Sequence, residues 1–257
     1  MNYRYIYLLH EYPFFFFLKD FDDKFRYNTW ILCNYLSRHV RKLHLPTDGE
    51  YNLLSCCITK EKDRVRIIPE KCLCVSLHVS EEEINAYQEM RDEHDRFEYY
   101  FSLLERGYRL ASQAHEIPID EFLKLHQMFR YVGYKNEWLF KKKMLHDYGI
   151  KVILEHVLTS YAYHLKLTVT DMKGLHMNSG YIFTTYPDDI FFNKEVRHLV
   201  ITDNTLLITD FLNHPQIECQ LDNLTNGIIK SKCLNENTKL YIPNEQNFED
   251  FEKLKWK

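Results

Sequence analysis

Residues 161–170 have the sequence YAYHLKLTVT, and this stretch decides the fold class. Apolar side chains occupy every second position, which is typical of a β-strand with one covered face and one solvated face. Short apolar runs recur across residues 137–211, separated by turns such as residues 171–174 (DMKG) and 203–204. Strands joined by short turns pair with their chain neighbours, so we predict an antiparallel β-meander. Its solvated face would carry His164, Lys166 and Thr168.

The chain before the meander predicts a mixed part followed by helices. We expect strands at residues 2–9 and 72–79, a hairpin of 51–59 with 64–68, and a helix over about 24–43 capped by Asp22 or Asp23. Residues 14–17 (FFFF) are expected to form a buried strand or a core-facing turn. Ser80 and Glu83 form a capping box that opens a long helix, with a break near residues 91–95 and an end before Pro118. A second helix follows and closes at Gly133, which completes a helical hairpin.

These elements predict an α+β protein with three parts. They are a mixed N-terminal part at residues 1–79, a helical hairpin at 80–135, and an antiparallel β part at 136–257 that ends in a short helix near residues 248–256. One continuous domain is the alternative, since 257 residues suffice for a single large core. Residues 223–237 are polar and are expected to be rich in loops.

Composition limits the class of protein. The formal net charge of -4 and the pI of about 6.4 do not favour wholesale binding to nucleic acid or to an anionic membrane. No apolar run is long enough for a membrane span, and no signal peptide is recognised at the start, so a cytoplasmic location is the expectation. The oligomeric state is not indicated.

Neither the cysteines nor the histidines form a recognisable reactive site. The seven cysteines are expected to be reduced thiols, and the neighbouring Cys56 and Cys57 would point to opposite faces of one strand, so no metal site is predicted. His78-Val79-Ser80 resembles half of the motif of the two-histidine phosphoesterases, but a second copy is missing and Ser80 is better explained as a helix cap. Glycine-rich phosphate loops and nucleophile elbows are also missing from the sequence, so no catalytic residue and no cofactor is assigned.

Charged clusters offer candidate binding surfaces. Residues 37–44 (SRHVRKLH) and 141–143 (KKK) are basic, and each is explained more simply by a helix C-terminus or an edge strand than by an anion site. The acidic cluster in the first part of the long helix is stronger. Part of it complements the helix dipole, and a solvated face is the simplest explanation of the rest. The sharper interpretation is a negative docking surface for a basic partner. Its candidate residues are Glu89, Asp92, Glu93, Asp95 and Glu98.

Part of the meander resembles a known family. Residues 136–143 (NEWLFKKK), 149–152 (GIKV), 163–167 (YHLKL) and 185–192 (TYPDDIFF) are similar to bacterial immunity proteins of polymorphic-toxin systems. The resemblance, mainly within residues 136–192, implies a cytoplasmic bacterial protein without catalytic residues that binds and neutralises a cognate toxin. It implies no site residue.

Three hypotheses about function follow. The first is a non-enzymatic protein-binding protein, such as an immunity protein or antitoxin with a basic protein toxin as its partner. The second is a hydrolase or nucleotide-modifying enzyme with a site built from dispersed histidine and acidic residues. The third is a structural assembly subunit. The missing motifs and the acidic helix favour the first.

Overall fold

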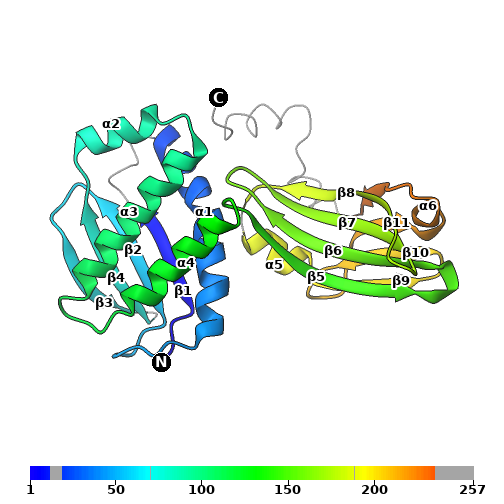
Figure 1. The fold of residues 1–257 in the computed structure, drawn as a ribbon, viewed down its shortest axis with the longest axis horizontal. Helices are drawn as coiled ribbons and strands as arrows, with labels where there is room; N and C mark the ends of the chain where they lie inside the picture. The colour runs from blue at the N-terminus through cyan, green and yellow to red at the C-terminus, as the bar shows by residue number, and fades with distance from the viewer. Residues whose placement is uncertain (12–18, 70, 188, 235–257) are drawn as a thin grey trace. The chain divides into compact units, whose positions relative to one another are not determined.

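The computed structural model describes residues 1–11, 19–69, 71–187 and 189–234. It has the α+β class that the sequence predicts. The chain divides into two compact units, one formed by Met1–Asn136 and one that begins at Glu137 (Figure 1). The predictions for residues 14–17 and for the terminal helix near 248–256 lie outside the described residues.

The first unit is built on a sheet with the strand order β1-β2-β4-β3. Strands β1, β2 and β4 run parallel, and β3 runs antiparallel to β4. The predicted hairpin of residues 51–59 with 64–68 is therefore wrong, because β4 lies between β2 and β3. Every residue of β4 from Cys72 to Leu77 is buried, which demands a central position, whereas β3 carries Arg64 and Arg66 and suits an edge. The strands are β1 (Tyr5–His10), β2 (Leu53–Thr59), β3 (Arg64–Ile68) and β4 (Cys72–His78).

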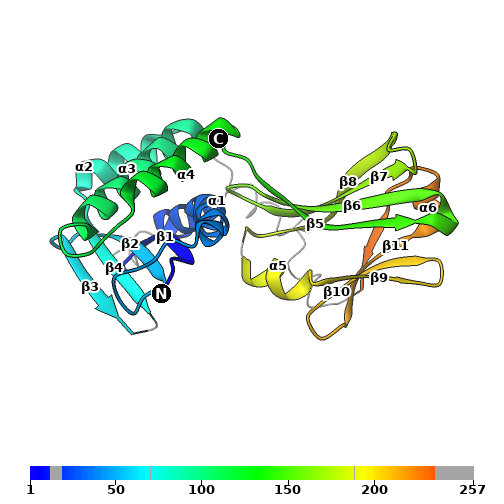
Figure 2. The same cartoon turned by 60° about the horizontal axis from the view of Figure 1, so that its bottom comes forward.

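Helices α2, α3 and α4 lie on one side of this sheet (Figure 2). The close contact of α3 is made at Gly107, where an added Cβ atom would stand 2.3 Å from the Cys56 sulfur. A residue without a side chain is therefore required there. The segment 80–135 thus shares its core with the sheet of residues 5–78. The helices are α1 (Lys19–Leu43), α2 (Glu81–Glu89), α3 (Glu93–Ala111) and α4 (Ile119–Tyr131).

Two helix boundaries differ in detail from the prediction. Helix α1 begins at Lys19, so Asp22 and Asp23 lie inside its N-terminal turns instead of capping it. The break in the long helix falls at residues 90–92, where Asp92 caps α3 by accepting a hydrogen bond from the His94 amide. None of the described helices is both long and apolar enough to cross a membrane.

The second unit opens with the predicted meander. Four antiparallel strands follow one another in the order β5-β6-β7-β8, and in β7 Tyr163, Leu165, Leu167 and Val169 are all fully buried. The predicted alternation is therefore confirmed. The strands are β5 (Asn136–Leu145), β6 (Ile150–Leu158), β7 (Tyr163–Asp171) and β8 (His176–Thr185), with the short helix η1 (His146–Tyr148) between the first two.

The rest of the predicted meander belongs to a second sheet with the order β12-β11-β10-β9. Figure 2 shows the two sheets of this unit as two layers. Of the segment predicted to be rich in loops, residues 235–237 lie outside the described residues, and residues 226–230 form a loop. The end of a short helix and a short strand were not predicted, because both are too short to establish a periodic pattern. The elements are α5 (Asp189–Glu195), β9 (His198–Thr202), β10 (Thr205–Thr209), β11 (Pro215–Gln220), α6 (Leu221–Thr225) and β12 (Ser231–Cys233).

Candidate protein-interaction surface

The predicted acidic residues lie where α2 ends and α3 begins, but they do not share one role. Glu98 faces α4, where Arg130 donates hydrogen bonds of 2.8 and 2.7 Å to its two carboxylate oxygens and the Tyr134 hydroxyl donates another of 2.9 Å. The hydrogen bond from Arg130 is the main reason that the pKa of Glu98 is lowered. Arg130 also lies 4.3 Å above the Phe101 ring. Glu98 is therefore part of the packing between α3 and α4.

The other four acidic residues remain on the surface. Glu89, Asp92, Glu93 and Asp95 are all exposed, although the Asp92 carboxylate also accepts the 2.7 Å hydrogen bond that caps α3. They lie within seven positions of the chain that also contain Arg91, so acidic side chains outnumber the basic ones there by three. Arg96, which is buried, adds an attraction to Asp92 and Glu93. Such a cluster is suited to a positively charged partner.

The C-terminal end of α4 lies at the same end of the helical hairpin as the start of α3, where the acidic residues are. Tyr134, in the turn after α4, stacks on Phe97 of α3 at 4.9 Å and meets the His94 ring edge-on at 5.5 Å. Both Gly133 and Tyr134 have a left-handed backbone, with φ values of 65° and 57°. This turn folds the chain back so that Tyr134 reaches α3, and it fixes the end of α4 beside the beginning of α3.

Apolar side chains also project around the C-terminal end of α4, where they share a hollow with Tyr35 of α1. Tyr131 is 93% exposed, and Met128 and Val132 are 45% and 40% exposed. Together with Tyr35 and Gln127 they line a shallow hollow of about 300 Å³. An aromatic ring held almost wholly in water next to an apolar hollow is unusual for a solvated helix and common at protein-binding sites. We call Glu89, Asp92, Glu93, Asp95, Met128, Tyr131 and Val132 the hairpin-end surface.

Sequence reasoning missed the apolar half of this surface. The spacing of Phe122, Leu125, Phe129 and Val132 predicts one buried face for α4, and the first three are indeed buried. Val132 is exposed instead, because it follows the last helical residue, and Met128 and Tyr131 fall off the buried face. The spacing alone therefore contained the signal, because a large apolar residue on the polar side of an amphipathic helix is a candidate contact residue.

The solvated face of the meander is largely satisfied within itself. The His164 ring stacks on Tyr181 at 4.3 Å, and its Nδ1 lies 2.8 Å from the Thr184 hydroxyl. Lys166 forms an ion pair of 3.9 Å with Glu155 on the neighbouring strand. These residues support the sheet across its strands.

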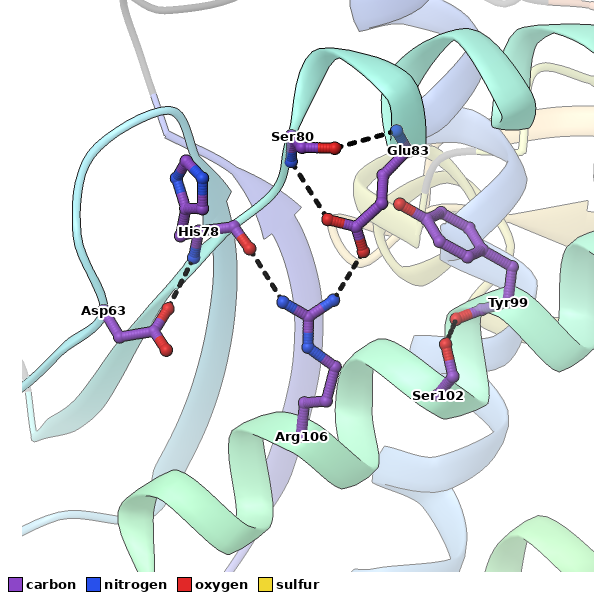
Figure 3. Close-up of polar contacts among 7 residues, drawn as sticks. All are labelled: Asp63, His78, Ser80, Glu83, Tyr99, Ser102 and Arg106. Carbon is purple, nitrogen blue, oxygen red and sulfur yellow. Dashed lines mark hydrogen bonds and ion pairs between the residues drawn. The ribbon is translucent and has the colours of Figure 1, made fainter.

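His78 and Ser80 hold the start of α2 and do not converge on a common point (Figure 3). The Ser80 hydroxyl accepts a hydrogen bond from the Glu83 amide, and Glu83 accepts one from the Ser80 amide, as the capping box predicts. The His78 ring instead lies against the carbonyl groups of Lys60 and Glu61. Arg106 completes the network by donating 2.7 Å hydrogen bonds to Glu83 and to the His78 carbonyl. These hydrogen bonds have a structural role, since they hold the first turn of α2 in place.

The neighbouring cysteines of β2 lie on opposite faces of the first sheet. Cys56 packs under α3 at Gly107, while Cys57 hydrogen-bonds Cys74 on the other face. That bond, followed by one from Arg66, lowers the pKa of the Cys74 thiol. Arg66 is itself held by Glu11 at 3.1 Å. Among the described residues, no group of three or more His, Cys, Asp or Glu side chains is arranged to hold a metal ion.

Comparison with known proteins adds no relative to these observations. No protein-family model, no curated protein and no solved structure matches the chain.

Proposed function

We propose that the protein is a non-enzymatic binding protein that docks a basic protein partner on its hairpin-end surface. The observation that carries the proposal is Tyr131, an aromatic side chain that is 93% exposed beside an apolar hollow and at the same end of the hairpin as four exposed carboxylates. Interfaces are commonly anchored by one or two aromatic residues, and a rim of charge steers the partner toward them.

The finer proposal is that the partner is a toxin, which would make the protein an immunity protein. The resemblance of residues 136–192 to immunity proteins motivates it, and the acidic half of the hairpin-end surface supports it. An acidic binding protein can cover the basic surface of a toxin by charge complementarity. The partner for the experiment is to be sought among the products of neighbouring genes, where a gene for a secreted toxin would identify it.

The test is the affinity for that partner measured by calorimetry. Tyr131→Ala is expected to weaken binding by about 30-fold, the usual effect of losing an aromatic anchor. Reversing Glu89, Glu93 and Asp95 to Lys is expected to lower the affinity by about tenfold or more, and this loss should shrink at high salt. Asp92 is left unchanged because it caps α3.

A matched control reverses Glu50, Glu61 and Glu116 to Lys, which changes the net charge equally at exposed positions of the first unit outside the hairpin-end surface. Binding that is weakened equally by both triple variants would show that only net charge matters. If Tyr131→Ala bound the partner with unchanged affinity, Tyr131 would not be the residue that anchors it. Killing of the host by the toxin in the presence of the unmodified protein would contradict the immunity role alone.

A further inference from the structure

A second surface of the first unit lies at the end of the sheet where β1, β2 and β4 begin. There a hollow of about 580 Å³ is lined by basic side chains that come from separate segments of the chain. They are Arg4 before β1, Arg41 in the last turn of α1, His44 after it, and Lys71 in the turn before β4. The other lining residues are Met1, Asn2, Tyr3 and Asn52, so none of the eight is acidic.

Hydrogen bonds between main-chain groups fix the walls of this basic hollow. The Arg4 amide donates to the Asn52 carbonyl at 2.7 Å, and the Asn52 amide donates to the Lys71 carbonyl at 2.9 Å. On the other wall, the Tyr3 amide donates to the Leu45 carbonyl at 2.9 Å. The segments that bear the cations are therefore held in place before any ligand arrives, which reduces the entropy lost on binding.

Two of the basic residues adopt an unfavourable backbone conformation. His44 and Lys71 have φ values of 50° and 62°, in the left-handed region that costs about 1 kcal/mol for residues with a Cβ atom. Glycine or asparagine would relieve that cost at either position. The positions instead hold two basic side chains that line the same hollow.

The rest of the basic segment 37–44 is used elsewhere. Arg38 donates a 2.6 Å hydrogen bond to the Asn136 side chain, and burial lowers its pKa to about 10. His39 stacks on Tyr35 at 4.1 Å. Arg41 donates from its Nε group to the Ser37 carbonyl at 2.8 Å, its guanidinium lies 5.1 Å from the centre of the Tyr5 ring, and the same side chain lines the hollow. The structure thus separates structural cations from those that surround a cavity.

We propose that the basic hollow binds a small anion that carries several linked phosphate groups. The three positive charges of Arg4, Arg41 and Lys71 exceed what a single monoanion would neutralise. The C-terminus of α1 contributes about half a negative charge nearby, which is too little to cancel them. The volume is within the range of small-molecule sites, and Arg and Lys are the side chains that usually hold phosphate oxygens.

The experiment titrates the full chain with inorganic triphosphate at low salt, with inorganic orthophosphate as the comparison. Saturable binding with one triphosphate per chain is expected, and orthophosphate should bind at least about tenfold more weakly because it meets fewer cations. The double variant Arg4→Gln with Lys71→Asn is expected to lose triphosphate affinity by about 100-fold. Both side chains are exposed, and asparagine tolerates the backbone of position 71, so folding should be retained and is checked by circular dichroism.

The matched control is Lys42→Gln with Lys173→Asn. It removes the same charge, from the same helical turn as Arg41 and from an exposed hairpin loop. It should bind triphosphate within about threefold of the unmodified chain, as expected for charges outside the cavity. Absence of saturable binding at millimolar triphosphate would overturn the proposal. Equal losses in the two double variants, or equal affinities for triphosphate and orthophosphate, would overturn it as well.

Discussion

The two units of this protein build their sheets from strands in opposite ways. In the first unit β1 pairs in parallel with β2, so that Tyr5 lies opposite Leu53 with the whole of α1 between them in the chain. In the second unit β6 and β7 are joined by a short turn, and Leu158 lies opposite Tyr163. Parallel pairing requires long connections, whereas antiparallel pairing works with tight turns. The first unit therefore depends more on contacts between distant segments.

Aromatic packing gives the largest expected effect and separates the two units. Phe129 of α4 is fully buried against Tyr35 at 4.5 Å and Phe97 at 5.4 Å. Phe129→Ala is expected to cost about 4 kcal/mol of stability, because the cavity left by a core phenylalanine refills poorly. Hydrogen exchange read by mass spectrometry should show the loss of protection in α1, α3 and α4.

The matching change in the second unit is Phe192→Ala, where the ring stacks on Tyr163 at 4.4 Å. In this variant, the loss of protection from hydrogen exchange is expected in β6, β7 and α5. Loss of protection over both units in either variant would mean that the two cores unfold together, and the comparison between them would no longer hold.

Glycine serves different purposes in the two units, which gives the next prediction. Gly107→Ala is expected to destabilise the first unit by about 3 kcal/mol, because the new methyl group would overlap the Cys56 sulfur in a packed core. Adding Cys56→Ala should restore much of the loss in urea titrations. Gly149→Ala has open space but a φ of 65°, so only about 1 kcal/mol should be lost through the left-handed backbone. A harmless Gly107→Ala variant would contradict the close contact of α3 with β2.

The strands could be predicted from sequence because alternation is a local property. Residues 163–169 revealed their covered face without reference to any partner. Pairing was predictable only where the partner came next in the chain, which is why β7 with β8 was foreseen and β4 between β2 and β3 was not. A hairpin was predicted for β2 and β3 because short polar connections favour one.

The candidate surface could be predicted in part for the same reason. Glu89, Asp92, Glu93 and Asp95 are near neighbours in sequence and remain together on the surface. Glu98 belonged to the same run, but its partner Arg130 is 32 positions further on, and no local pattern shows that pairing. The basic hollow could not be predicted, since Arg4, Arg41 and Lys71 meet only in the fold.

A buried histidine makes the stability of the first unit depend on pH. Burial lowers the pKa of His126 to about 3, and its Nε2 lies 3.2 Å from the Tyr108 hydroxyl. The unfolded chain takes up a proton on this residue below about pH 6.5 while the folded chain stays neutral. Stability is therefore full above that pH and falls as the pH drops toward 3. Between pH 7 and pH 5 the loss from this group is about 2 kcal/mol.

The measurement is urea unfolding at both pH values for the unmodified chain and for His126→Phe, which retains a ring beside Phe101. The variant is expected to lose less stability on acidification, by about that amount. His94→Gln, at an exposed position, should behave like the unmodified chain. Equal pH dependence in all three proteins would show that His126 is not held neutral in the folded state.

The smallest effect tests how the first unit protects the free edge of its parallel sheet. The Ile6 and Leu8 amides, on the side of β1 away from β2, donate 3.1 Å hydrogen bonds to the Ser37 hydroxyl and the Cys33 sulfur of α1. Positions four apart on a helix rise by about 6 Å, close to the rise of two residues in a strand, so the two periods match here.

Ser37→Ala leaves one buried amide without its partner and is expected to cost about 1 kcal/mol. Ser102→Ala is the control, because that exposed hydroxyl bonds only a carbonyl of its own helix and should change stability little. Hydrogen exchange should show faster exchange at Ile6 in Ser37→Ala and not in the control. An unchanged Ile6 amide would mean that α1 shields the edge by covering it, and that the hydroxyl contributes nothing. Faster exchange of the Ile6 amide would show that side chains of α1 take the place of a neighbouring strand at this edge of the first unit. In the meander of the second unit, each strand instead pairs with the strand that comes next in the chain.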